Sequence, residues 1–380
     1  MKNRSTLLLI HLDLIKKMKK PSYLIVVASS CQMYSGTGTA IFDWINFARG
    51  DFEFSILMDT KDFSNFLIAQ KFCEENDIPL YASQFLKLPG CIDSGVADIN
   101  KHLTEYYYDY VECISWANSS TNLNVLNSKR RGQKLVFVPH SQPLWTIPNF
   151  HRYYMTLPIF KMTLDSADFI FIDSPAEKLL DVFHNVDLSR IHYVPLGVDT
   201  SVYNTGNERK INGQVVCICD CREHRKRIDL LIRAFSLAFK INSNLRLVLG
   251  GKGSDKVEIP TEIANAVTCL GYVMQADLVN VYRHSSLFIL LSDYEAFGLP
   301  IAEALCCGTQ VLINKLVVLE SLFSGLQGVT FTFNTETKKT AELINLLAFG
   351  NVDNQEIAQQ AAYVFSLKNT YGNKRSILLR

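Results

Sequence analysis

Short apolar runs alternate along the chain with polar turns and with segments of helical spacing. Runs of this kind, bounded by turn residues, predict buried strands. They fall at residues 23–28, 54–58, 110–114, 135–138 and 169–172 in the first half, and at 214–220, 245–251, 267–272, 287–291 and 311–313 in the second. Strands that alternate with helices form βαβ units and doubly wound sheets. The pattern therefore predicts an α/β protein with two Rossmann-like sheets in succession.

The length of 380 residues exceeds what one hydrophobic core usually serves, which also favours two domains. A charged and polar stretch at 204–213 is predicted to be the linker. We expect the first domain at 18–203 and the second at 214–360. Residues 1–17 have no place in a sheet. They are either a mis-assigned start, with Met18 the true one, or a short amphipathic helix that touches a membrane.

The stretch 286–313 predicts a strand, a short helix and a second strand. Pro300 at the first helical position and Gly308 just after the last are the residues expected at helix ends. The backbone N–H groups just before Pro300 have no intrahelical acceptor and suit a phosphate. These groups belong to Phe297, Gly298 and Leu299.

Two carboxylates flank this turn, Glu295 before the helix and Glu303 one turn into it. A carboxylate can accept from two hydroxyls at once, so Glu295 can face a sugar and Glu303 a ribose diol. With the intervening Phe-Gly and the Gly308-Thr309 pair, the stretch resembles the E-x7-E signature of glycosyltransferase family 4. The resemblance implies a GT-B fold, in which two Rossmann-like domains face each other across a cleft. It also implies that a last helix, at 361–380, returns to the first domain.

A second resemblance is a segment of the form I-x-V-x-P-x-G-V-D at 191–199, which closes the first domain in that family. A third is the basic cluster that opens the helix after residue 227, where the macrodipole disfavours cations unless an anion is bound. In the family an arginine and a lysine hold the donor diphosphate there. The resemblance places these roles on Lys226 and on Arg222 or Arg225, because Cys221 stands at the usual arginine position and Arg227 at the usual glycine.

Five further site residues come from the resemblance. Tyr272 and Val273 lie where the family holds the nucleotide base. Gly36 and Gly38 follow the first strand in a glycine-rich loop, which in the family contacts the donor phosphate or the acceptor. His140 follows the strand at 135–138, where ligands of such sheets bind, and the family often has a histidine there near the donor sugar.

The resemblance implies a hexosyltransferase that moves a sugar from a nucleotide-diphosphate sugar, with retention of configuration, to a glycan, a lipid-linked glycan or a small molecule. Polysaccharide biosynthesis is the expected setting, and a UDP- or GDP-sugar is the expected co-substrate. Glu295 and His140 are the predicted catalytic residues. No Asp-x-Asp motif is present, so we predict metal independence and no cofactor. The alternatives are a sugar-nucleotide-binding partner subunit whose catalysis has lapsed and a GT-B sugar-nucleotide epimerase.

Composition adds limits on partners and location. The net charge of +1 gives no reason to expect nucleic acid. Cys217, Cys219 and Cys221 recur at period two on one face of a predicted strand, and buried free thiols, the interpretation we favour, indicate a reducing cytoplasm. The aromatic and basic stretch at 143–154 is expected to pack internally, although it could line an acceptor site or contact a membrane. We therefore expect a cytoplasmic protein, with peripheral contact to the inner membrane face as an alternative.

Overall fold

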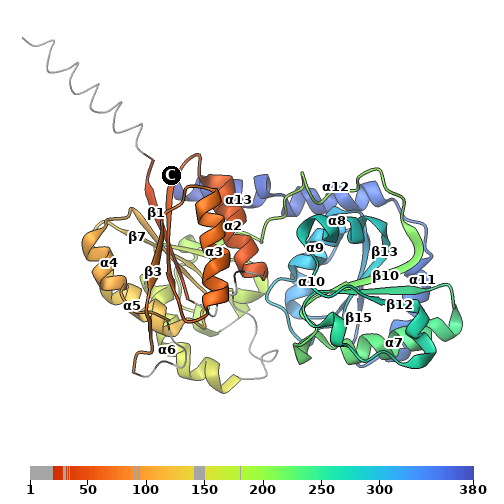
Figure 1. The fold of residues 1–380 in the computed structure, drawn as a ribbon. Helices are drawn as coiled ribbons and strands as arrows, with labels where there is room; N and C mark the ends of the chain where they lie inside the picture. Colours follow the sequence, from red (N-terminus) through yellow and green to blue (C-terminus); the bar gives the residue numbers. More distant parts are fainter. Residues whose placement is uncertain are drawn as a thin grey trace, which may run out of the picture. The chain divides into compact units, whose positions relative to one another are not determined.

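The computed structural model describes residues 20–380 apart from 29–30, 32, 34, 90, 92–94, 141–149 and 180. The predicted extension at 1–17 lies outside the described residues. The chain forms two compact units (Figure 1). The first comprises residues up to 140, 151–171 and 182–192, and the second comprises the rest, including 361–380.

The first unit contains a parallel sheet in the order β3-β2-β1-β6-β7-β8-β9. Its strands are β1 (Ser22–Val27), β2 (Glu53–Asp59), β3 (Leu80–Ser83), β6 (Tyr110–Ile114), β7 (Lys134–Val138), β8 (Phe169–Ile172) and β9 (Ile191–Tyr193). The helices between them are α2 (Gly36–Ala48), α3 (Phe63–Glu75), α4 (Ile99–Glu105), α5 (Ser119–Ser128) and α6 (Phe150–Ser166). A short antiparallel pair, β4 (Phe85–Leu86) and β5 (Gly95–Val96), lies outside this sheet.

The second unit contains a six-stranded sheet in the order β12-β11-β10-β13-β14-β15. Its strands are β10 (Ile211–Ile218), β11 (Arg246–Gly250), β12 (Val267–Cys269), β13 (Ser285–Leu290), β14 (Gln310–Asn314) and β15 (Val329–Thr332), and every pair is parallel. Its helices are α7 (Ile228–Ile241), α8 (Gln275–His284), α9 (Leu299–Cys306), α10 (Val317–Phe323), α11 (Thr337–Ala348), α12 (Asn354–Phe365) and α13 (Leu367–Leu378). Figure 1 shows α8, α9 and α12 on one side of this sheet and α7 on the other. Numbered along the chain, the order is the 3-2-1-4-5-6 of a Rossmann fold.

Short 3₁₀ helices occupy several of the connections. They are η2 (Pro175–Leu179), η3 (Asp181–Phe183), η4 (Leu188–Arg190), η5 (His224–Lys226), η6 (Ser254–Lys256) and η7 (Thr261–Ala266). Of these, η5 is the one that carries predicted site residues, since it holds Arg225 and Lys226.

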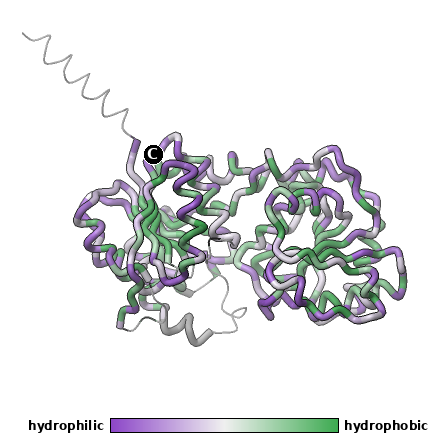
Figure 2. The backbone as a smooth tube through the Cα atoms, in the orientation of Figure 1, coloured by the Kyte–Doolittle hydropathy of each residue, from purple (hydrophilic) through white to green (hydrophobic). Residues whose placement is uncertain are grey.

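Burial explains why these segments form central strands. Tyr23 to Val27 of β1 and Leu287 to Leu290 of β13 are at most 1% exposed, so both faces of each strand are covered, as parallel sheets require. In Figure 2 the hydrophobic colour accordingly follows the strands inside each unit, while the helices and loops around them mix hydrophobic and hydrophilic residues. Burial of this apolar area is the main stabilising term of each unit.

The predicted strands are confirmed, and the strands missing from the prediction lie at sheet edges. β3 and β15 each have a neighbouring strand on one edge alone, and their mostly half-buried residues include polar ones that interrupt the apolar run typical of a central strand. The predicted linker is too long, because 211–213 already belong to β10. Gly36 and Gly38 are in the first turn of α2 and not in a loop before it.

No helix within residues 20–380, in so far as the structure describes them, has the length and apolarity needed to span a bilayer.

Candidate active site

The strand order of the second unit creates one place where a ligand can approach. β10 and β13 are neighbours, and the chain leaves them toward opposite sides of the sheet. Ligands of open α/β sheets bind beyond the carboxyl ends of the strands at such a switch point. The segment 219–227 follows β10 and the segment 291–298 follows β13. They are joined directly, since the N–H of Asp293 donates to the carbonyl of Arg225 at 2.7 Å.

Three predicted site residues meet at this point. Lys226 Nζ lies 2.6 Å from Glu295 Oε1, and Arg225 Nη1 lies 3.3 Å from Glu295 Oε2. The same Arg225 nitrogen donates to the carbonyl of Tyr294 at 3.1 Å, and its guanidinium lies 5.0 Å from the centre of the Tyr294 ring. The Lys226 and Glu295 side chains are 11% and 7% exposed. The two cations, which follow β10, are therefore held in a largely covered position against a carboxylate that follows β13.

Electrostatics keep this carboxylate ionised. Burial alone would raise the pKa of Glu295, but Lys226 and Arg225 outweigh it and hold the pKa below its ordinary value. Burial likewise opposes the charge of Arg225, whereas Glu295 and Glu223 raise its pKa. Breaking such a pair by removing one partner leaves a charge uncompensated. A diphosphate carries two negative charges and accepts charge-assisted hydrogen bonds from lysine and arginine, so it can compete with Glu295 for these cations.

Arg227, which stands where the family has glycine, explains that preference. It adopts a left-handed conformation, with φ of 49°, where glycine has no steric cost. Its guanidinium is anchored to Asp229 at 3.1 Å and to Asp293 at 3.0 Å. Asp293 also accepts from Asn334 at 2.7 Å. Sequence reasoning missed this support of the site, although Asp293 lies only two residues before Glu295.

The helix α9 presents its N-terminus as predicted, with Pro300 in the first turn and Gly308 past the last. Gly298 has a φ of 88°, which requires glycine, and a Cβ there would lie 2.8 Å from Ile301. The Phe297 side chain is core, since it packs against Phe323 and Phe365. Only the backbone of this turn is thus free to serve a ligand.

Glu303 lies in a buried polar cluster. Glu303 is 6% exposed, and its Oε2 accepts a hydrogen bond from the hydroxyl of Tyr282 at 3.0 Å. Burial raises the pKa of Glu303 to about 7, although hydrogen bonds from Tyr282 and Tyr203 lower it. Neither tyrosine was identified from the sequence, because only the tertiary fold brings them to α9.

Arg222 and Tyr272 line a cavity of about 570 Å³ together with Lys252, Gly253, Asp255, Lys256, Cys269, Leu270 and Gly271. Arg222 pairs with Asp220, its Nε at 2.8 Å from Oδ1, and its side chain is 57% exposed. Val273 packs beside Gly250, where a Cβ would lie 3.0 Å from it. The structure thus places Arg222 with the predicted base site and Arg225 with Glu295.

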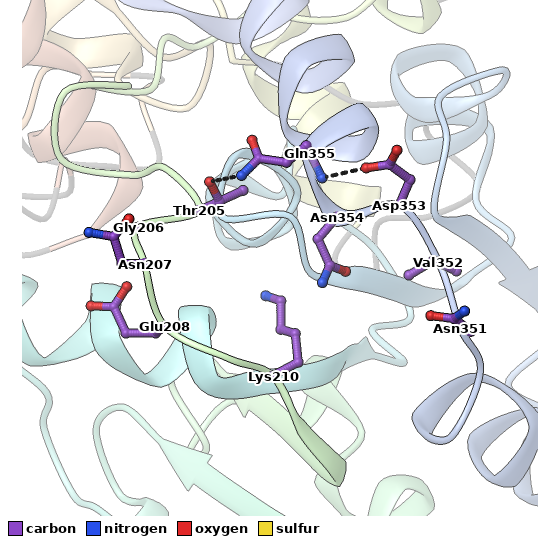
Figure 3. Close-up of a pocket in the computed structure, with 10 residues that line it drawn as sticks. All are labelled: Thr205, Gly206, Asn207, Glu208, Lys210, Asn351, Val352, Asp353, Asn354 and Gln355. Atoms are coloured by element: carbon purple, nitrogen blue, oxygen red, sulfur yellow. Dashed lines mark hydrogen bonds between the residues drawn. The ribbon is translucent and has the colours of Figure 1, made fainter.

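A somewhat larger cavity, of about 640 Å³, lies elsewhere in the second unit (Figure 3). It is lined by Thr205, Gly206, Asn207, Glu208, Lys210 and residues 351–355. The Lys210 ammonium points into its wall and donates to Thr309 Oγ1 at 2.6 Å and to the carbonyl of Cys307 at 3.0 Å. None of the predicted site residues lines this cavity, so its size does not make it the active site.

The remaining predicted residues belong to the first unit. His140 follows β7 and has a φ of 47°, an unusual conformation for a residue with a Cβ. Gly38 is closely packed: a Cβ there would lie 2.1 Å from the carbonyl oxygen of Met33. Close packing of α2 on the preceding segment therefore accounts for Gly38. Residues 143–149 of the aromatic stretch lie outside the described residues.

Comparison with known proteins indicates what the second unit is similar to. Residues 207–363 match the family model "Glycosyl transferases group 1". The matched stretch includes Arg222, Arg225, Lys226, Glu295 and Glu303. It corresponds to the second domain predicted from the sequence.

Curated relatives match over about two fifths of the chain. The D-inositol 3-phosphate glycosyltransferase of Mycolicibacterium smegmatis is 31% identical over 170 residues, which cover 40% of this chain and 38% of the relative. The mannosylfructose-phosphate synthase of Agrobacterium fabrum is 28% identical over 174 residues, 39% of this chain and 38% of the relative. The chain thus matches about two fifths of the length of these relatives.

Solved structures match over nearly the whole chain. Alr3699/HepE of Anabaena, solved with UDP and glucose, has a TM-score of 0.72 at 17% identity and covers 94% of this chain and 99% of its own. Sucrose-phosphate synthase of Thermosynechococcus elongatus has a TM-score of 0.70 at 14% identity, with coverage of 95% and 98%. The GT-B fold predicted from the sequence, two Rossmann-like α/β units, is confirmed.

Proposed function

We propose that the protein is a retaining glycosyltransferase that moves a hexose-type sugar from a nucleotide-diphosphate sugar to an acceptor hydroxyl. The observation that carries the proposal is the meeting of Lys226 and Arg225 with Glu295 at the switch point of the glycosyl transferase domain. A donor site needs cations for a diphosphate and an acceptor group for the sugar, and this arrangement supplies both within one contact.

In the proposed reaction, the bond between the anomeric carbon and the departing phosphate oxygen breaks while the acceptor oxygen bonds the same carbon from the same face. The acceptor proton passes to the departing phosphate. Lys226, Arg225 and the backbone N–H groups of Gly298 and Leu299 stabilise the negative charge that develops on the diphosphate. Glu295 orients the sugar and stabilises positive charge at its ring, and it does not form a covalent intermediate. His140, the other predicted catalytic residue, belongs to the first unit, and its role at the sugar stays a prediction.

The rest of the donor has candidate partners in the same domain. The cavity beside Arg222 and Tyr272 would take the base, and Glu303 the ribose. UDP is the first nucleotide to test, since a structure of this fold was solved with UDP and glucose. We propose that the residues named here act without a metal ion or other cofactor. The acceptor is proposed to be a glycan or lipid-linked glycan, met in the cytoplasm or at the inner membrane face.

A partner subunit that binds a sugar nucleotide without turning it over is the second candidate. Two observations favour it: Cys221 replaces the usual arginine, and Glu295 is already engaged by both cations. The two functions differ in whether the glycosidic bond breaks.

Turnover without an acceptor tests the proposal. Purified protein is incubated with UDP-glucose or GDP-mannose in EDTA, and nucleoside diphosphate release is followed by chromatography. Slow release that Glu295→Gln reduces about a hundredfold is the expected result. A sugar nucleotide that is bound but not cleaved would support the partner subunit, and conversion into another sugar nucleotide would support an epimerase. Release that requires Mg²⁺ would contradict metal independence.

A further inference from the structure

Three cysteines form a row where β10 leaves the sheet. The Sγ atoms of Cys217 and Cys219 lie 4.0 Å apart, and those of Cys219 and Cys221 also lie 4.0 Å apart. The side chains share one face because they recur at period two. We expected buried thiols here, and this is correct only for Cys217, which is 1% exposed. Cys219 and Cys221 are half-buried, so solvent can reach them.

The backbone of the two outer cysteines is held in place. The N–H of Cys219 donates to the carbonyl of Gly250 at 3.1 Å, and the N–H of Cys221 donates to that of Lys252 at 2.9 Å. The strand has ended at Ile218, and the chain bends at Cys219. Two residues of extended chain separate Cα atoms by about 6.6 Å, and a disulfide accepts up to about 6.8 Å. The two sulfurs are 4.0 Å apart, so rotation of the side chains can bring them into bonding distance.

The surroundings favour a thiolate on the middle sulfur. Donation from the flanking thiols, Cys217 first and then Cys221, lowers the pKa of Cys219 well below its ordinary value. The Lys226 ammonium acts in the same direction, whereas burial opposes it. Thiolates next to a cation are the sulfurs that react with oxidants. Cys221 keeps its proton, since donation to Cys219 and burial raise its pKa.

We propose that Cys219 and Cys221 are a redox modification site that hydrogen peroxide converts into a reversible disulfide. The Cys219 thiolate attacks one peroxide oxygen, the O–O bond breaks, and the departing hydroxide takes up a proton to become water. The Cys221 sulfur then attacks the Cys219 sulfenic acid, the S–O bond breaks, and a second water leaves. Two thiols lose two electrons and one peroxide is reduced to two waters.

Other roles for the row are less consistent with the structure. Among the described residues, no group of three or more His, Cys, Asp or Glu side chains is arranged to hold a metal ion. Cys217 is a poorer partner than Cys221 because it lies inside the strand and is fully covered. Cys269 is half-buried, and its charge raises the pKa of Cys221. A test therefore has to exclude a disulfide between Cys269 and one of the two outer cysteines.

Peptide mass measurement tests the site. The native protein is treated with hydrogen peroxide, alkylated with iodoacetamide in denaturant and digested with trypsin. Cleavage after Lys210 and Arg222 releases one peptide with Cys217, Cys219 and Cys221. The expected peptide carries one alkyl group, on Cys217, and has lost two hydrogens; dithiothreitol before alkylation restores three alkyl groups. Three alkyl groups after peroxide, or a crosslink to Cys269, would overturn the proposal.

Two serine variants define the roles of the two sulfurs. Cys221→Ser should leave Cys219 without a partner, so that it accumulates as sulfinic acid, 32 mass units heavier. Cys219→Ser should slow oxidation of the peptide at least about tenfold, to the rate of Cys269, because the thiolate is lost. Cys269→Ser is the matched control and should leave disulfide formation unchanged. Equal oxidation rates in Cys219→Ser and wild type would contradict the proposal, and the wild-type peptide tests it even if a variant fails to fold.

The disulfide would also affect the donor site, a consequence that rests on the proposed function. The loop from Cys221 to Lys226 carries both diphosphate cations, and the bond would fix its first residue. Peroxide should therefore weaken UDP binding at least about fivefold in wild type, reversibly with dithiothreitol, and not in Cys221→Ser. The peptide mass reports the disulfide without any nucleotide. A disulfide without UDP binding would thus count against the proposed function alone.

Discussion

Lys226 and Glu295 are 69 residues apart in the chain, and their side chains meet at 2.6 Å between Nζ and Oε1. Each stands just beyond the carboxyl end of one of two adjacent parallel strands. The ion pair is 11% and 7% exposed, so water screens it little. In the proposed reaction, Lys226 exchanges this carboxylate for the donor diphosphate, which leaves Glu295 available to the sugar.

Glu295→Gln keeps the shape of the side chain and removes its charge. If Glu295 stabilises positive charge at the sugar ring, its loss should raise the activation free energy by roughly 3 kcal/mol. Turnover should then fall about a hundredfold. The measurement is the rate of nucleoside diphosphate release at saturating donor. Glu320→Gln, a change at a half-exposed carboxylate paired with Lys315, is the control. A fall of less than tenfold would count against the electrostatic role.

Arg225 and Arg222 should differ in their effect on nucleotide binding. Arg225 lies against Glu295, whereas Arg222 pairs with Asp220 at the edge of the cavity. Hydrogen bonds to a charged group are worth about 1.5–3 kcal/mol. Arg225→Ala should therefore weaken UDP binding at least about tenfold in calorimetry, and Arg222→Ala less than about fivefold. The reverse order would assign the diphosphate to Arg222.

Glu303→Ala should raise the apparent KM for the donor about tenfold with little change in kcat. A ribose contact is the same in the ground state and the transition state, so it contributes to binding alone. Initial rates over a range of donor concentrations give both constants. Glu342→Ala, at an exposed position of α11, is the control. A loss confined to kcat would place Glu303 outside the ribose site.

The pKa of Glu303 predicts how stability depends on pH. In the folded protein this pKa is about 7, above the ordinary value of 4.5 that applies to the unfolded chain. As pH rises from 4.5 to 7, the unfolded chain releases this proton first, so folding loses up to about 3 kcal/mol from this group. Glu303→Gln does not titrate. Its melting temperature relative to wild type should therefore increase between pH 5 and pH 8, and a constant difference would contradict the raised pKa.

The central strands were predictable because a strand covered on both faces is a continuous apolar run, as in β1 and β13. Edge strands such as β15 were not, since alternating threonines dilute that run. The donor-site candidates came from motif spacing, which marks Lys226 and Glu295 individually.

What spacing cannot give is the tertiary pairing. The contact of Arg225 with Glu295, the anchoring of Arg227 by Asp293, and the burial of Glu303 against Tyr282 each join segments distant in the chain. Sequence reasoning accordingly left open whether Arg222 or Arg225 serves the diphosphate, and the fold separates them.

The measurement that tests the central claim most directly is a thermal-shift panel with UDP, GDP, ADP and their common sugars on wild type, Lys226→Ala and the control Lys240→Ala. Lys240 is exposed at the end of α7 in the same unit. A ligand at a hundred times its Kd stabilises the folded protein by about 2.7 kcal/mol, which such a scan resolves. We expect one nucleotide to raise the melting temperature of wild type and Lys240→Ala but not of Lys226→Ala. An equal rise in all three would contradict a diphosphate site at the Lys226–Glu295 pair, and no rise in any would contradict nucleotide-sugar binding itself.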